Sequence, residues 1–322
     1  MTVLDAKDKR IILELDHNAR QSASSIAKKL NLSKESVNYR LKKLQRLGLI
    51  RGFSTIINVE KLGYSYYNVF LQMQDVSKEV EKQLIDYVNK NPNITWTVKT
   101  MGQYAFFICI MARNSNEFNK HLSELLSEFG KYINDYSLFL VTDAFRTPYK
   151  YLEEDPYHLY KIDDVKTEEE QVKLDDADFK LLRLLDINPL MPLTELARQL
   201  NLTANAINYN IKKLVKQKVI QAFRPRLDCS KIGLQWFIAL FKLNHAELQK
   251  QKNFINYLLH HKQIVYLVEG VGAWSMMVDI HSKDMQEMNN ILNEIKNQFP
   301  NIIKSESIVM VPEVHKVRFC VG

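Results

Sequence analysis

The sequence predicts an α+β protein made of two copies of one unit, and three observations lead to this prediction. When it is shifted by 170 positions, the 322-residue chain aligns with itself without a gap, with 17 identities in the 50 positions from 4 to 53. In each copy, apolar residues first recur at helical spacing, and strand-like and helical runs then alternate. Apolar residues make up 46% of the chain, which excludes a disordered or low-complexity protein.

The first part of each copy has the pattern of three short helices and a strand. In copy one, Asp5 and Ser33 are good N-caps for the first and third helices, and Gly48 ends the third. Residues 50–57 then alternate like a strand or wing. Three short helices with a tight turn between the last two form a helix-turn-helix, so we expect winged helix-turn-helix domains at 1–58 and 174–228.

The second part of each copy has the order β-α-β-β-α-β. This order predicts a ferredoxin-like βαββαβ domain, with both helices on one face of an antiparallel sheet, at 62–145 and again at 232–322. In copy one the expected elements are 66–73, 80–88, 94–99, 104–111, 118–129 and 133–141. Two apolar strands, 106–111 and 237–241, suggest further association into a homo-oligomer.

The segment 146–173 joins the two copies. It has eight acidic and five basic side chains and is not rich in Gly or Ser, so we expect a linker that packs partly against a domain. Four tyrosines support this expectation: Tyr149, Tyr151, Tyr157 and Tyr160.

The third helix of each copy is the strongest functional signal. With Val37, Leu41 and Leu44 turned inward, its polar side chains face outward, and residues 34–47 carry five basic groups against one acid. Such a helix fits the major groove of double-stranded DNA, where Asn reads adenine and Lys or Arg binds guanine or phosphate. A solvated basic surface is the plainer alternative. The candidate DNA-binding residues are Ser33, Lys34, Glu35, Asn38, Tyr39, Arg40, Lys42, Lys43 and Arg46 in copy one, and Thr203, Asn205, Asn208, Tyr209, Asn210, Lys212 and Lys213 in copy two.

The two candidate readers differ in charge. Residues 4–53 contain twelve Lys/Arg and five Asp/Glu, a net of +7, whereas residues 174–223 contain seven and five, a net of +2. Since each contact with a phosphate adds affinity, we expect copy one to supply most of the DNA binding.

The rest of the sequence predicts no catalytic site, no metal and no cofactor, and therefore no enzyme. His260 and His261 are neighbours and point in different directions on a helix, and the other histidines lack ligand spacing. Three distant cysteines suggest a reducing, cytoplasmic location, and no apolar run approaches the ~18 residues of a membrane span. Two hairpins place a glycine beside an aromatic residue, as packed turns or as the rim of an effector site: Gly102 and Tyr104, Gly272 and Trp274.

The stretch from Ile26-Ala27 through Leu30-Asn31-Leu32-Ser33 to Gly48-Leu49-Ile50, followed by Leu62-Gly63-Tyr64, resembles the Lrp/AsnC ("feast/famine") transcription factors. This resemblance covers both copies and implies a fused pair of transcription regulators. It also implies a second domain that dimerises and binds an amino-acid-like effector. The family often has Gly-x-Tyr-Asp at the hairpin, whereas this chain has Ala105 and Ser275 in place of the acid.

Two alternatives remain. Sirohaem decarboxylases resemble the same two-part architecture and occur as pairs, but a tetrapyrrole enzyme needs convergent His and Arg groups. An architectural protein that compacts DNA would share the helices and show little sequence preference.

Overall fold

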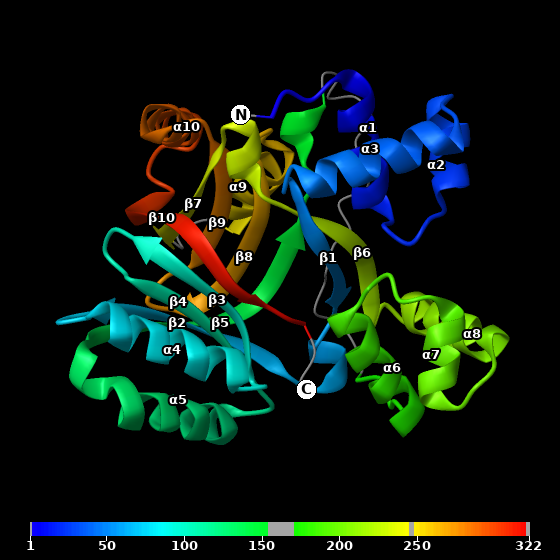
Figure 1. Ribbon diagram of the computed structural model, residues 1–322. Helices are drawn as coiled ribbons and strands as arrows, with labels where there is room; N and C mark the ends of the chain where they lie inside the picture. Colours follow the sequence, from blue (N-terminus) through cyan, green and yellow to red (C-terminus); the bar gives the residue numbers. More distant parts are fainter. Residues whose placement is uncertain (1, 154–170, 245–247, 320–322) are drawn as a thin grey trace.

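The computed structural model describes residues 2–153, 171–244 and 248–319, and it confirms the tandem α+β fold. Two helical heads lie on one side of the molecule and a β-barrel on the other, with a two-stranded ribbon between them (Figure 1). Among the described residues, no helix is long and apolar enough to cross a membrane.

Each head is a three-helix unit followed by a strand. The first contains α1 (Ala6–His17), α2 (Ala23–Leu30), α3 (Lys34–Arg46) and β1 (Ile50–Ile57). The second contains α6 (Asp176–Ile187), α7 (Leu193–Leu200), α8 (Ala204–Lys216) and β6 (Ile220–Leu227). The side chains of Asp5 and Ser33 cap α1 and α3 as predicted, and a cap of this kind contributes about 1 kcal/mol.

The expected wing strands pair with each other. Strands β1 and β6 form an antiparallel ribbon in which Ser54 lies opposite Arg224. These two residues are equivalent under the 170-residue shift, so a pseudo-two-fold axis passes between them. The heads are therefore related to each other as the two subunits of a dimer are, within a single chain.

The remaining elements form two βαββαβ units. Copy one contributes β2 (Ser65–Met73), α4 (Lys78–Lys90), β3 (Ile94–Met101), β4 (Phe106–Ala112), α5 (Ser115–Phe129) and β5 (Ile133–Arg146). Copy two contributes β7 (Gln235–Leu243), α9 (Leu248–His260), β8 (Ile264–Gly272), β9 (Met276–Ser282), α10 (Met285–Gln298) and β10 (Ile303–Val317).

The two four-stranded sheets join edge to edge into one closed barrel, in the order β10-β3-β4-β2-β5-β8-β9-β7. Copies one and two meet at β5–β8 and at β10–β3. At the first junction the strands approach so closely that a Cβ on Gly270 would lie 2.2 Å from the Leu140 carbonyl oxygen, which explains the glycine. Since the barrel has no open edge, strands 106–111 and 237–241 cannot carry the association that we expected of them.

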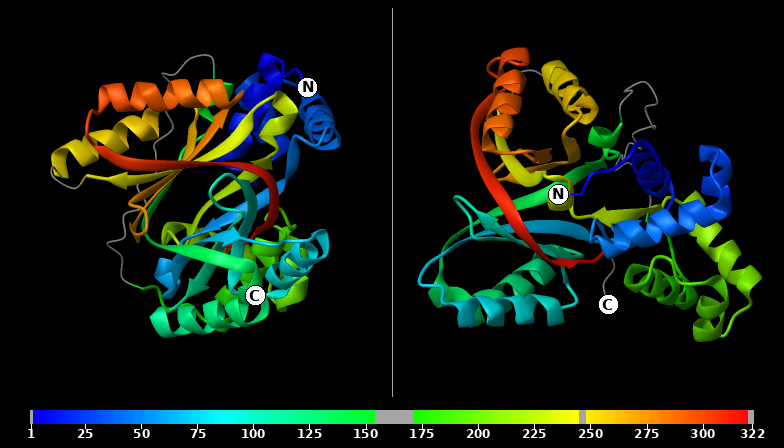
Figure 2. Two further views of the ribbon diagram at one scale, coloured as in Figure 1. Left: turned by 90° about the vertical axis from the view of Figure 1, so that its left-hand side faces the viewer. Right: turned by 45° about the horizontal axis from the view of Figure 1, so that its top comes forward.

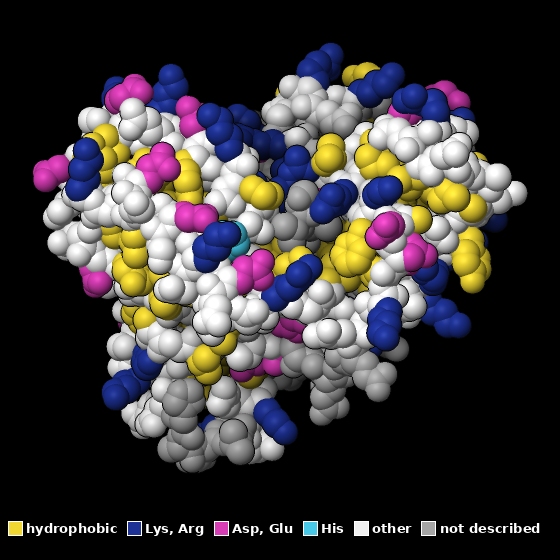
Figure 3. Space-filling view, turned by 90° about the horizontal axis from the view of Figure 1, so that it is seen from below, with side chains coloured by type: hydrophobic (Ala, Val, Ile, Leu, Met, Phe, Trp, Pro, Cys, Tyr) yellow, Lys and Arg dark blue, Asp and Glu magenta, His cyan; other side chains and the backbone are white. Residues whose placement is uncertain are grey.

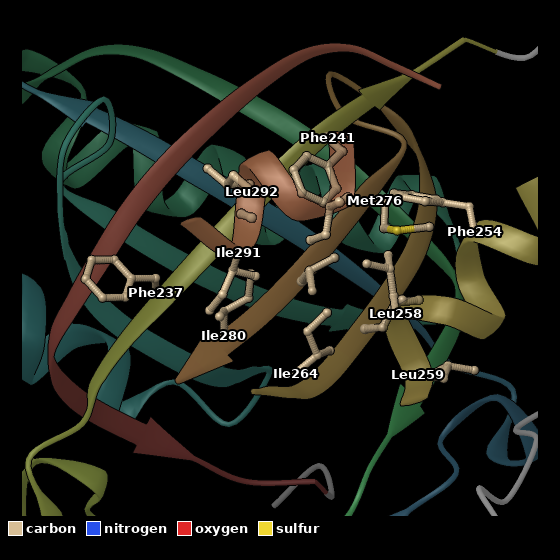
Figure 4. Close-up of a cluster of buried hydrophobic side chains, with 14 of the residues drawn as sticks. Phe237, Phe241, Phe254, Leu258, Leu259, Ile264, Met276, Ile280, Ile291 and Leu292 are labelled. Carbon is tan, nitrogen blue, oxygen red and sulfur yellow. The ribbon is translucent and has the colours of Figure 1, made fainter. Parts of the chain in front are cut away.

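Both faces of each sheet are buried. Helices α9 and α10 cover the outer face of one sheet, and α4 and α5 cover the outer face of the other (Figures 2 and 4). Along β7, Phe237 and Phe241 point to the helices, whereas Ile238 and Leu240 point into the barrel against Phe107 of the other copy's sheet. Each buried side chain of this size contributes about 1.5–3 kcal/mol, so the two copies stabilise each other through the barrel interior.

The start of the connecting segment packs against both copies, and the Tyr149 amide donates to Asp16 of copy one at 3.3 Å. The Tyr149 hydroxyl donates to the Pro225 carbonyl at 3.2 Å, and the Thr147 hydroxyl donates to the Ile264 carbonyl at 2.7 Å. The buried Lys150 ammonium donates to the Leu259 carbonyl, and burial lowers the pKa of Lys150 to about 7. Tyr157 and Tyr160 lie outside the described residues.

Candidate nucleic-acid interface and the cavity beside it

The outward face of α3 exposes most of the predicted reader residues. Tyr39 is 66% exposed, and its equivalent Tyr209 on α8 is 68% exposed. On these two helices the exposed candidates are Lys34, Glu35, Asn38, Tyr39, Lys42, Arg46, Asn205, Tyr209 and Lys212, with Ser33 and Thr203 as the capping residues. Asn208 and Asn210 are half-buried.

Two of the predicted readers in copy one bind a buried acid instead. Arg40 donates to Asp8 at 2.6 Å, Lys43 approaches the other oxygen of Asp8 at 3.3 Å, and the Asp8 side chain is only 1% exposed. Arg40 also donates to Asp5 at 2.7 Å. These contacts hold α1 against α3, and they reduce the positive charge that the helix presents to DNA.

Copy two has a simpler version of this contact. Lys213 donates to the buried Asp178 at 2.6 Å, and Asn210 stands where copy one has Arg40. Among the described residues, the second carboxylate oxygen of Asp178 has no hydrogen-bond partner. We did not identify either acid from the sequence. The signal was present, because Asp8 and Asp178 interrupt the apolar faces of α1 and α6 at equivalent positions.

The heads contact each other directly as well as through the ribbon. The Arg20 guanidinium donates to the carbonyl oxygens of Pro189 and Met191 at 2.6 and 3.1 Å, and stacks over the Phe223 ring. The Ala19 amide donates to the Phe223 carbonyl at 2.8 Å. These bonds fix the separation and orientation of α3 and α8.

The two glycine-aromatic hairpins meet inside the molecule. The Trp274 indole donates to the Tyr104 hydroxyl at 3.3 Å, which in turn donates to Ser137 at 3.0 Å. Tyr104 is 2% exposed. A Cβ on Gly102 would lie 3.0 Å from the Ile308 carbonyl, and one on Gly272 would lie 2.4 Å from the Leu138 carbonyl. Each hairpin thus packs against a strand of the other copy.

A cavity of about 580 Å³ lies between the β1–β6 ribbon and the barrel. The ribbon contributes Arg51, Arg224 and Arg226, and the barrel contributes Arg146 and three aromatic side chains: Trp96, Trp236 and Tyr266. This cavity could not be derived from sequence spacing, because its walls come from both copies.

Most charged groups of the cavity are neutralised. Arg224 bonds both oxygens of Asp16 at 2.7 Å, and Arg51 bonds Asp228 at 2.6 Å. Burial raises the pKa of Asp279 to about 8, with Arg146 opposing the shift, so this carboxyl is mostly protonated at neutral pH. Burial also lowers the pKa of His281 to about 4, which leaves the imidazole neutral. The two other arginines, Arg146 and Arg226, therefore leave the cavity with positive charge.

A family model for the winged helix-turn-helix DNA-binding domain matches residues 4–51 and 174–221, the same part of each copy. Among curated proteins, the HTH-type transcriptional regulator FL11 of Pyrococcus abyssi is 34% identical over 37% of this chain and 78% of its own length. An uncharacterized HTH-type transcriptional regulator of the same organism is 31% identical over 45% of this chain and 96% of its own length. The chain belongs to the Lrp/AsnC family of transcriptional regulators. Each of these relatives spans about one copy, so this member of the Lrp/AsnC family is a fused pair.

We expected no enzyme, and the whole-chain comparison contradicts that expectation. The solved structure of the sirohaem decarboxylase NirDL aligns over 98% of this chain and 94% of its own, with a TM-score of 0.62 and 12% identity. At this identity the likeness concerns the fold. Our exclusion relied on the scatter of histidines along the sequence. Packing of the β1–β6 ribbon against the barrel brings arginines from distant segments around one cavity, so sequence spacing was the wrong criterion.

Proposed function

We propose that this protein is a sequence-specific DNA-binding transcription regulator in which one chain acts as a ready-made dimer. The observation that carries the proposal is the β1–β6 pairing, which holds two helix-turn-helix heads about a pseudo-two-fold axis. The contacts of Arg20 with Pro189 and Met191 support a fixed spacing between the reading helices. In this proposal the protein acts in the cytoplasm on double-stranded DNA.

The DNA site follows from the differences between the heads. A homodimer reads a palindrome because its two-fold axis imposes one on the site. Here α3 presents Lys34 and Glu35 where α8 has Ala204 and Asn205. The preferred site is therefore two unlike half-sites, separated by about one helical turn or a multiple of it.

Selection of binding sites from random DNA tests this proposal, with the number of chains per site measured alongside by native mass spectrometry. We expect one chain on two unlike half-sites. Asn38→Ala should relax the preference at one half-site and Asn208→Ala at the other, which makes each variant the control for the other. A perfect palindrome that binds two chains, each through α3 alone, would contradict the proposal.

The effector and any larger assembly belong to the same proposal. Lrp/AsnC resemblance favours an amino-acid-like effector and homo-oligomers. With every barrel strand paired on both sides, association between chains has to use the outer helices or the heads. Sedimentation velocity across a range of chain concentrations measures the assembly state.

The second candidate function is a tetrapyrrole enzyme, and one observation favours it. NirDL has been solved with an iron-uroporphyrin III analogue, and the cavity of this chain gathers four arginines and the buried His281. Incubation with sirohaem, followed by absorption and mass spectrometry, separates the candidates. An enzyme should shift the Soret band and yield a product that has lost carbon dioxide, whereas a regulator should yield no such product.

A further inference from the structure

The cavity lies between the β1–β6 ribbon, which carries the heads, and the barrel. Arg226 belongs to β6 in the ribbon, whereas Arg146 belongs to β5 in the barrel. In the view from below, several Lys and Arg side chains lie in the middle of the face, with Asp and Glu side chains among them (Figure 3). A ligand in this cavity therefore contacts both parts at once.

Two of the four arginines, Arg146 and Arg226, form no ion pair among the described residues, although Asp279 lies near the first and Asp186 near the second. Within the described ranges, we find no hydrogen bond or ion pair from Arg226 or Arg146. Arg146 stacks over the rings of Tyr266 and Phe319, at 4.5 and 5.3 Å from their centroids. Although the Arg226 side chain is exposed, partial burial and the nearby Arg318 lower its pKa, with Asp186 opposing the shift. Both guanidiniums are free to bind an anion, and their fork geometry suits a carboxylate.

The barrel wall of the cavity is aromatic. Trp96 and Trp236 stack with ring centroids 5.9 Å apart and an interplanar angle of 22°, and Tyr266 packs edge-on against Trp96. Such a wall suits a flat apolar group.

The aromatic wall also contains a buried polar atom that lacks a partner. In the part of the chain that the structure describes, the indole nitrogen of Trp96 has no hydrogen-bond partner, whereas the indole of Trp236 lies at the carboxyl of Asp279 and lowers its pKa. A buried donor without a partner is uncommon in folded proteins, and the Trp96 indole beside this cavity favours a ligand that accepts from it.

We propose that this cavity binds an organic carboxylate with a flat, aromatic body, and that the bound ligand ties the ribbon to the barrel. The proposal rests on the regulator function, because it makes this ligand an effector of DNA binding. The carboxylate faces Arg146 and Arg226, and the flat body lies against Trp96 and Trp236.

The binding test uses 2,6-naphthalenedicarboxylate as the probe and the full-length chain without DNA. Two of the chain's three tryptophans line the cavity, so we expect saturable quenching of tryptophan fluorescence. Arg226→Ala should weaken binding about tenfold, since a charge-assisted contact of this kind is lost. Arg226→Lys should weaken it less, and Arg10→Ala, an exposed arginine of α1, should leave it unchanged.

Equal binding of the neutral dimethyl ester, or equal binding by the Arg226→Ala variant, would overturn the proposed site. The effector role has its own measurement, the affinity for the selected DNA site with and without saturating probe. A change that disappears in Arg226→Ala supports the role, and unchanged affinity overturns it. Failure of the regulator function would appear separately, as absence of specific DNA binding by the unliganded chain.

Discussion

The two heads show that charge in the sequence differs from charge on the DNA-facing surface. Copy one has a net charge of +7 against +2 in copy two over equivalent residues. In copy one, however, Arg40 and Lys43 both bind the buried Asp8, whereas in copy two only Lys213 binds Asp178. Along the reading helices, the exposed basic residues are three on α3, Lys34, Lys42 and Arg46, and two on α8, Lys212 and Lys216. Copy one uses part of its charge to hold α1 against α3.

The largest expected difference between the heads is in stability. Asp8→Ala leaves Arg40 and Lys43 without their buried partner and should destabilise the first head by about 3–5 kcal/mol. Asp178→Ala should destabilise the second head less. In the described structure one oxygen of Asp178 binds Lys213, and the other oxygen has no hydrogen-bond partner. Urea unfolding, followed by hydrogen exchange within each head, measures both. Equal losses of unfolding free energy would show that the second basic partner of Asp8 adds nothing to the stability of the first head.

The barrel interior offers a second comparison between the copies. Asp279 of copy two stands where copy one has Cys109, whose pKa burial raises to about 12. With a pKa raised to about 8, Asp279 binds its proton more tightly in the folded chain than in the unfolded chain. Its contribution to stability is complete below about pH 4 and is lost as the pH rises through 8.

Between pH 6 and 8 this effect should remove about 2 kcal/mol of stability. Asp279→Asn should abolish that part of the pH dependence, whereas Cys109→Ser should leave it in place. Thermal unfolding across pH 5–9 is the measurement, and a wild-type profile that is flat between pH 6 and 8 would contradict the assignment.

The third expected effect concerns phosphate contacts. Changing Lys34, Lys42 and Arg46 to Ala should flatten the log–log salt dependence of DNA binding by roughly two to three units, if each contacts a phosphate. The matched change of Lys212 and Lys216 should flatten it by roughly one to two units. Arg40→Ala should act mainly on stability, because its guanidinium binds Asp5 and Asp8. A larger effect from the copy-two pair would reverse the ranking of the heads.

The smallest expected effect is at the base edges. The exposed Asn38 should lose about 1–3 kcal/mol of specific affinity when changed to Ala, with non-specific binding nearly intact. The half-buried Asn208 should lose less. Competition with random-sequence DNA measures the sequence-specific part of the affinity. A uniform loss of affinity on all DNA would assign Asn38 to a contact with the DNA backbone.

Much of the fold could be predicted because its signals are local. The caps at Asp5 and Ser33, the apolar stripe of α3 and the βαββαβ order all depend on residues close in sequence. The closed barrel and the β1–β6 ribbon could not be derived in this way, because they join strands from different copies. One local signal of the arginine-lined cavity was present in the sequence. Arg224 and Arg226 are two positions apart on a strand, so they point to the same face of β6.

The candidate site was predicted less completely for the same reason. Asn38, Tyr39 and Lys42 lie on the exposed face of α3 as the helical spacing indicates. The bond between Arg40 and Asp8 joins residues 32 positions apart, so no helical period reveals it. The cavity depends on contacts more than 100 residues apart, such as that of Arg224 with Asp16.

The β1–β6 pairing also sets how occupancy depends on the amount of protein. A regulator assembled from separate subunits loses its DNA-binding form on dilution, because the dimer dissociates as the subunit concentration falls. Here the second head is always present at the high local concentration that a covalent connection provides. Binding of a single chain to its site should therefore rise in simple proportion to chain concentration at low occupancy, and a cell that holds few molecules retains a fully assembled reader.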